Sequence, residues 1–244
     1  MNDCWGCTSW SIVDYYLRPK LAWYAIRREL RPITISIQRT IFTKAEYLHW
    51  RDRDDPEIKS DDIMWLDIWG VNSALEEVEI EFRLQCYDIT TGSKVYELIE
   101  SKGRIPANGS SQIASFNLSP RAPPDIDPSN TVVSVAFTDT RSVSQATEKP
   151  SGMLRSRSAG DWPQPLKYID FRDRGVKFSV DGEEITVTAK LPTKSVVLDV
   201  EGEDDSDLEW SDNGFDVMPG ETIKVRAKGL NGRKVTISWY GDSF

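Results

Sequence analysis

The chain contains 244 residues, of which 39% are hydrophobic and 28% are charged, and its formal net charge is −9. This balance supports packed cores and argues against global disorder, and the length suits one large domain or two ordinary ones. The excess of acidic groups argues against a broad nucleic-acid interface. No apolar run approaches the roughly 20 residues that a helix needs to cross a bilayer, and the first residues do not have the pattern of a signal peptide.

The first 30 residues differ from the rest of the chain. They open with many aromatic and aliphatic side chains, and Pro19 then stands where a first-turn proline can begin a helix. Ala22, Ile26 and Leu30 recur at the spacing of one helical face, which predicts an amphipathic helix of about three turns that stops before Pro32. A helix of this length is marginal alone and has to pack on something. We therefore interpret the segment as the end of a larger domain.

The pattern changes to a period of two from residue 33 onward, as is typical of half-buried strands. Alternation of this kind covers 33–38 and 78–87, whereas 64–71 is apolar on both faces and suits a central strand. A further strand is predicted at 132–137. Residues 139–165 are rich in Ser, Arg, Gly and Pro, which indicates a loop or linker.

Short strands resume after this linker at close spacing. The Asp-Gly pair at 181–182 lies between two strand-like runs and predicts a hairpin. About seven short strands in roughly 80 residues are typical of a sandwich. We therefore expect a mainly β chain with two Ig-like β-sandwich domains, at 31–165 and 166–244, preceded by a short strand and helix at 1–30.

Cysteine and histidine offer little for redox chemistry or metal binding. Cys4 and Cys7 form a CxxC, but a thioredoxin-like site needs this motif between a strand and a helix of an α/β domain. Zinc would need two more ligands, and the chain has one histidine, His49, and no second CxxC. The three cysteines are irregularly spaced, which favours inert thiols in a reducing compartment, and we expect a cytoplasmic location.

Other polar patterns have ordinary structural interpretations. His49 lies near Asp52 and Asp54, but no G-x-S-x-G motif accompanies this group. The acidic run at 201–209 lacks the spacing of an EF-hand loop and is interpreted as a solvated turn. No pair of carboxylates stands out as the two acids that a glycoside hydrolase needs. We therefore expect no cofactor, no metal and no catalytic residue in this chain.

Aromatic residues are plentiful, with nine tryptophans in the chain. Rows of exposed aromatic rings can stack on sugars, so carbohydrate binding by the sandwiches is one hypothesis. Trp65 and Trp239 lie in predicted strands, where we expect them to belong to the cores.

Several segments of the chain resemble β-mannosidases of glycoside hydrolase family 2, in particular the fungal type. The beginning of the chain resembles the end of their catalytic barrel, and two later segments resemble their linker and terminal Ig-like domain. The matching residues are 2–5, 8–20 and 24–28 for the barrel, and 161–168 and 211–221 for the later segments.

The resemblance implies that 1–30 is a remnant of the last strand and helix of a (β/α)8 barrel. Active sites lie at the carboxyl ends of barrel strands. Trp5 is therefore implied to line the sugar pocket as an aromatic wall, with Trp10 nearby, while Gly6 stands where the family would have a proline. The family's acid/base and nucleophile glutamates come from earlier strands, so the resemblance assigns neither role to a residue of this chain.

Two functions follow from these patterns. In the first, the chain is the C-terminal, non-catalytic part of a retaining β-mannosidase and is inactive alone, either as a fragment or truncated gene product or as a part that docks onto a separately encoded barrel; the barrel binds the β-mannoside. In the second, it is a stand-alone β-sandwich protein that binds carbohydrate or protein. Neither function involves nucleic acid or a membrane.

Overall fold

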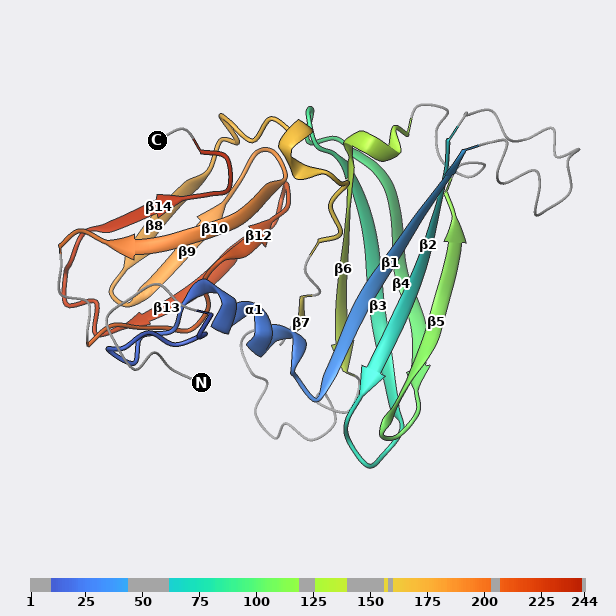
Figure 1. The fold of residues 1–244 in the computed structure, drawn as a ribbon, viewed down its shortest axis with the longest axis horizontal. Helices are drawn as coiled ribbons and strands as arrows, with labels where there is room; N and C mark the ends of the chain where they lie inside the picture. Colours follow the sequence, from blue (N-terminus) through green and yellow to red (C-terminus); the bar gives the residue numbers. More distant parts are fainter. Residues whose placement is uncertain are drawn as a thin grey trace, which may run out of the picture. The chain divides into compact units, whose positions relative to one another are not determined.

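The computed structural model describes residues 10–43, 62–118, 126–139, 156–157, 160–202 and 207–242. The chain divides into two compact units: unit 1 comprises Met1–Leu30 and Asp170–Phe244, and unit 2 comprises Arg31–Ile169. Each unit contains two antiparallel sheets (Figure 1). The prediction of a mainly β chain with two Ig-like sandwiches is confirmed. In the part of the chain that the structure describes, no helix is long and apolar enough to span a bilayer.

Unit 2 is a sandwich of a three-stranded and a four-stranded sheet. The three-stranded sheet has the order β1-β2-β5, with β1 at Ile33–Thr43, β2 at Asp62–Asn72 and β5 at Gly109–Asn117. The four-stranded sheet has the order β4-β3-β6-β7, with β4 at Lys94–Ile105, β3 at Val78–Asp88, β6 at Thr131–Asp139 and β7 at Ser156–Arg157. Short 3-10 turns occupy Pro128–Asn130 and Leu166–Tyr168.

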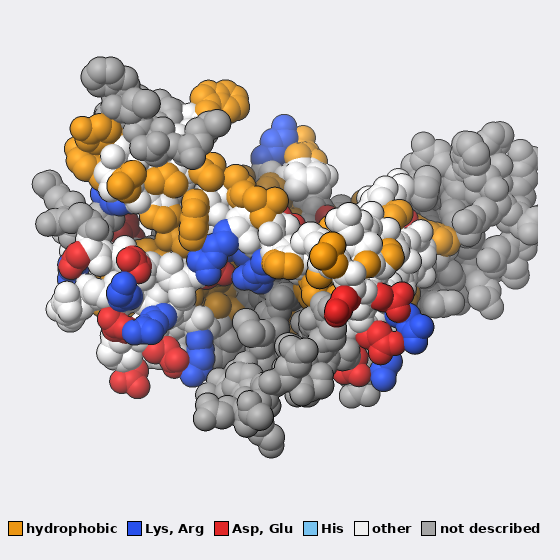
Figure 2. All heavy atoms as spheres, turned by 90° about the horizontal axis from the view of Figure 1, so that it is seen from below, with side chains coloured by type: hydrophobic (Ala, Val, Ile, Leu, Met, Phe, Trp, Pro, Cys, Tyr) orange, Lys and Arg blue, Asp and Glu red, His pale blue; other side chains and the backbone are white. Residues whose placement is uncertain are grey.

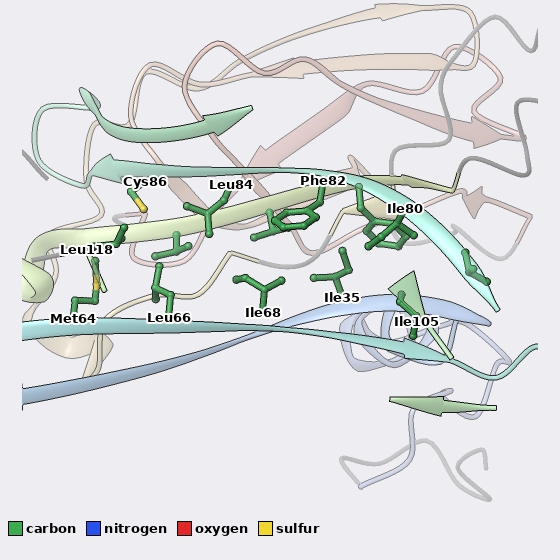
Figure 3. Packing of buried hydrophobic residues seen from close by; sticks show 14 residues of the cluster. Ile35, Met64, Leu66, Ile68, Ile80, Phe82, Leu84, Cys86, Ile105 and Leu118 are labelled. Atoms are coloured by element: carbon green, nitrogen blue, oxygen red, sulfur yellow. The ribbon is translucent and has the colours of Figure 1, made fainter. Parts of the chain in front are cut away.

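The core of unit 2 lies between these sheets and follows from the alternation of the strands. In β3, Ile80 and Phe82 are buried whereas Glu79 and Glu81 are exposed, as the period of two predicts. Figure 3 shows side chains of the two sheets meeting in this core. The packing is tight at Gly70, where an added Cβ would lie 2.5 Å from Cγ1 of Ile105.

Strand β2 is central, as predicted, but its two faces differ. Met64, Leu66 and Ile68 are fully buried in the core, whereas Trp65 lies on the opposite face and is only half-buried. The expectation that Trp65 belongs to the core is therefore wrong. The run looked apolar on both faces because an indole on the outer face cannot be told from a core indole by its residue type.

A buried arginine fastens the segment at residue 161 to the unit 2 sandwich. The Arg39 side chain is 6% exposed, and its Nε lies 2.5 Å from Oδ2 of Asp161. Its other nitrogens donate to the carbonyl oxygens of Asp161 and Thr131, both at 2.8 Å, and of Pro128 at 3.1 Å. Because a buried guanidinium needs this many acceptors, the contact fixes β1 against the start of β6 and the segment that follows β7.

The sandwich of unit 1 pairs a three-stranded with a four-stranded sheet. The first has the order β12-β10-β14, with β12 at Phe215–Val217, β10 at Thr193–Val200 and β14 at Val235–Ser238. The second has the order β11-β13-β9-β8, with β11 at Glu209–Trp210, β13 at Ile223–Lys228, β9 at Glu184–Thr188 and β8 at Lys177–Asp181.

Two sequence predictions in this sandwich are confirmed. Strands β8 and β9 form the hairpin predicted at Asp181-Gly182, and Gly182 has a φ of 60°, which glycine adopts without strain. Trp239 packs against the core, and its Nε1 donates to the carbonyl oxygen of Phe171 at 2.8 Å.

The Asn213 side chain replaces backbone pairing beside β10. The pairing of β10 with β12 is irregular between Thr193 and Val196. Beyond this point, the buried Asn213 amide accepts from the backbone N–H of Leu198 at 2.9 Å and donates to the carbonyl oxygen of the same residue at 2.8 Å. Both polar groups of Leu198 on this side of the strand are thereby satisfied.

We expect Asn213→Ala to lower the free energy of unfolding by about 2–3 kcal/mol, because it leaves the buried N–H and C=O of Leu198 without partners. Urea titration followed by fluorescence measures the change. Asn231→Asp is the matched control, since Asn231 is exposed and its positive φ of 49° suits Asp as well. Equal stability of the two variants would contradict the role assigned to Asn213.

Candidate functional site

The candidate functional residues predicted from the sequence lie in the first 50 residues of the chain. Trp5, Cys4, Cys7 and His49 lie outside the described residues. Trp10 is described, and its side chain is fully exposed, at 101% of the reference area. Of the two predicted pocket residues, the structure therefore places only Trp10, on the surface of unit 1.

Residues 11–20 form a compact loop that leads into the helix. Val13 and Pro19 pair through an isolated antiparallel bridge. The Asp14 carboxylate accepts from the Arg18 backbone N–H at 2.9 Å and from its Nε at 2.7 Å. Burial alone would raise the pKa of the Asp14 carboxyl. The hydrogen bonds and the charge of Arg18 outweigh this effect, so the pKa lies below its usual value. The loop thus has a defined shape ahead of the helix.

The predicted helix is present as α1, at Leu21–Glu29, and it packs on the unit 1 sandwich. Tyr24 is its buried residue, at 3% exposure. Burial, together with the nearby Asp212 carboxylate, raises the pKa of the Tyr24 hydroxyl above its ordinary value. Leu21 covers Gly214, where an added Cβ would lie 3.3 Å from Cδ2 of Leu21.

Arg28 attaches the helix to a loop far along the chain. Its Nη1 lies 2.5 Å from Oδ1 of Asp212 and donates to the carbonyl oxygen of Asn213 at 3.0 Å. Its Nη2 donates to the carbonyl oxygen of Gly214 at 2.9 Å. The planar guanidinium therefore spans three successive residues of one loop, a geometry that lysine cannot reproduce. Sequence reasoning missed this contact because 184 positions separate Arg28 from Asp212.

The segment leaves many large apolar side chains exposed, although α1 is anchored to the sandwich. Viewed from the side on which the segment lies, hydrophobic side chains gather on the surface of unit 1 (Figure 2). The exposed large side chains of the segment are Trp10, Tyr15, Tyr16, Leu17, Leu21, Ile26 and Leu30. A patch of this kind usually marks a surface that contacts another protein part.

Leu17 has an unusual backbone conformation within this surface. Its φ is 65°, in the left-handed region that a leucine rarely adopts, and its side chain is 70% exposed. An exposed leucine in this strained conformation is the kind of outlier that clusters at functional contacts, which makes Leu17 a candidate residue of the apolar surface.

The described acidic residues of the run after β10 form ion pairs with basic side chains. Glu201 pairs with Lys234 at 2.5 Å, Glu209 with Lys228 at 3.1 Å, and Asp207 with Arg233. Residues 203–206 lie outside the described part. Within the described ranges, no group of three or more His, Cys, Asp or Glu residues is arranged to hold a metal ion.

We expect Arg28→Met to loosen α1 from the sandwich, with a loss of about 1–3 kcal/mol in the local opening free energy, because the loop carbonyls and the partly exposed Asp212 lose their donor. Hydrogen exchange of the amides of residues 21–30 measures this loss. Arg27→Met is the control, because Arg27 stacks on the Trp23 ring at the surface. Unchanged protection in Arg28→Met would contradict the anchoring role.

Two family models match the chain. Residues 64–168 match the model described as a Mannosidase Ig/CBM-like domain, and residues 171–238 match a mannosidase model described as an Ig-fold domain. These matches cover most of unit 2 and most of the C-terminal part of unit 1.

Curated relatives extend the similarity over nearly the whole chain. Beta-mannosidase B of Thermothelomyces thermophilus is 31% identical over 232 residues, which are 93% of this chain and 25% of the relative. Beta-mannosidase B of Aspergillus fumigatus is 31% identical over 236 residues, again with 25% of its length covered. The chain thus spans about a quarter of the length of the curated relatives it matches.

Solved structures show the same fold. The β-D-mannosidase of Dictyoglomus thermophilum superposes with a TM-score of 0.68 at 20% identity, over 99% of this chain and 26% of its own. The exo-chitosanase of Amycolatopsis orientalis superposes with a TM-score of 0.58 at 17% identity, over 99% of this chain and 29% of its own. The predicted resemblance to the C-terminal region of β-mannosidases is confirmed.

Proposed function

We propose that this chain acts as the C-terminal, non-catalytic part of a β-mannosidase-type glycoside hydrolase, whose complete form removes terminal β-linked mannose. The observation that carries this proposal is the exposed apolar surface of residues 10–30, held in place on unit 1 by Arg28. The similarity to one quarter of β-mannosidase B supports the same conclusion. In this function the sandwich of unit 1 holds the segment, and the segment packs on a catalytic barrel.

The aromatic residues of the segment would then reach the sugar. We propose that Trp5 and Trp10 form the edge of the mannose pocket once the barrel is present. The full exposure of Trp10 in this unit supports the proposal, because it leaves the indole accessible to a sugar or to the barrel. The two acids of a retaining mechanism would come from the barrel, and this chain would supply neither.

We expect the purified 244-residue chain to give no hydrolysis of p-nitrophenyl β-D-mannoside, because it would not contain the two acids of the reaction. Co-expression with the preceding part of the Thermothelomyces thermophilus relative is expected to give a complex with activity. Release of p-nitrophenol measures both. Turnover by the chain alone that is lost when one of its carboxylates is changed would overturn the proposal.

We expect Leu17→Asn to weaken that complex about tenfold or more, because it removes an exposed apolar contact at the proposed interface. Asn fits a φ of 65° better than Leu, so the variant chain alone should be at least as stable as the parent. Analytical ultracentrifugation and thermal unfolding measure the two effects. Leu75→Asn is the matched control, because Leu75 is 88% exposed but belongs to unit 2. Equal effects of both substitutions would count against the interface.

We also propose that the protein works in the cytoplasm. Burial raises the pKa of the Cys86 thiol to about 12, so this thiol stays protonated and unreactive, as expected of a buried free cysteine in a reducing compartment. Asn108 begins an N-x-S sequon in an exposed turn, where a secretory pathway would be expected to attach a glycan. The intact mass of the protein from its native source tests this: the unmodified mass is expected, and a glycan on Asn108 would contradict it.

A further inference from the structure

The outer face of the sheet β1-β2-β5 in unit 2 has a composition that core packing does not explain. The side chains of β2 alternate, so that Trp65, Asp67, Trp69 and Val71 lie opposite to the buried Met64, Leu66 and Ile68. In the four rows that pair with these β2 residues, the neighbouring strands add neutral polar side chains to the same face. In register with the four β2 residues, these are Thr40, Gln38, Ser36 and Thr34 of β1, and Asn117, Ser115, Gln112 and Ser110 of β5.

Charge on this face excludes several kinds of ligand. None of these strand positions holds Lys or Arg, and Asp67 is their one carboxylate. A nucleic acid or another polyanion would find no cation here. The core of a protein interface is usually more apolar than a face on which eight of twelve positions are Ser, Thr, Asn or Gln.

Asp67 organises the polar part of the face. Its Oδ1 accepts from Oγ of Ser115 at 2.6 Å, from Nε2 of Gln112 at 2.7 Å and from Nε1 of Trp65 at 3.0 Å. No described residue donates to its Oδ2, which is therefore available to accept a hydroxyl. The side chains of this network are partly exposed to solvent, so the network carries little desolvation penalty. They are already in position before a ligand binds.

The same network fixes the orientation of the Trp65 ring. Its Nε1 donates to both Asp67 and Ser115, the latter at 2.7 Å, so the indole cannot rotate freely. Trp69 lies four residues further along the same face, about 13 Å away at roughly 3.3 Å per residue. Trp65 and Trp69 are both partly exposed, although Nε1 of Trp69 is buried, so an extended ligand of several rings, and not a single small ring, could contact both indoles.

We propose that this face binds a neutral oligosaccharide. The apolar faces of its pyranose rings would pack on Trp65 and Trp69, and its hydroxyl groups would bond to Asp67, Gln112 and the flanking hydroxyl and amide side chains. This site goes beyond the proposed function and does not depend on it, since the site lies in unit 2 and needs neither the segment 10–30 nor catalysis.

The test uses the full 244-residue chain with mannohexaose and cellohexaose in isothermal titration calorimetry, and with glucomannan in native gels. Saturable binding of at least one of these neutral ligands is expected, with no retention by the polyanion polygalacturonate. Trp65→Ala should weaken binding about tenfold or more, because it removes one stacking surface. Gln112→Ala, whose exposed side chain has one bond to Asp67, should weaken it about threefold without affecting folding.

The matched control is Tyr168→Ala, which removes another exposed aromatic ring of unit 2 and should bind as the parent does. Thermal unfolding of each variant separates loss of binding from loss of fold. The proposal is overturned if the parent chain binds no neutral oligosaccharide, or if Trp65→Ala and Gln112→Ala both bind like the parent. Preference for polygalacturonate, or a change of oligomeric state in Trp65→Ala with sugar binding unchanged, would also overturn it.

Discussion

The contact between the Arg28 guanidinium and the loop of Asp212, Asn213 and Gly214 holds the N-terminal helix on the unit 1 sandwich. A helix of nine residues is too short to persist alone. Arg28 satisfies two backbone carbonyls and one carboxylate of this loop, and Asn213 in turn satisfies the backbone of β10. The apolar side chains of residues 10–30 are therefore presented by a sandwich that holds their backbone in one arrangement, which is what a surface for a partner requires.

The two units use the same solution for attaching an irregular segment to a sheet. In unit 2, Arg39 binds Asp161 together with the carbonyls of Pro128 and Thr131; in unit 1, Arg28 binds Asp212 and its neighbours. Each guanidinium has several acceptors, so its charge is compensated where it is removed from water. Attachment of this kind fixes the position of each irregular segment relative to its sheet.

Much of the fold could be predicted from the sequence, whereas the contacts that create the candidate sites could not. The alternation in β3 and the spacing of Ala22, Ile26 and Leu30 are local patterns, and both predicted the right element. The position of Trp65 depends on which face of β2 is covered, and a run that is apolar on both faces does not reveal this. The pairing of Arg28 with Asp212 joins distant positions, and one sequence offers no signal for it. Trp5 and His49 lie outside the described residues, so their roles stay predictions.

The partition of unit 1 has a consequence for biosynthesis. Its helix and its sandwich are separated in the chain by the whole of unit 2, and the partners Arg28 and Asp212 are 184 positions apart. At ribosomal elongation rates, on the order of ten seconds or more pass between the synthesis of these two residues. During that interval the nascent helix has no docking site on its own sandwich, so Tyr24 and Arg28 reach their native contacts only when translation has nearly finished.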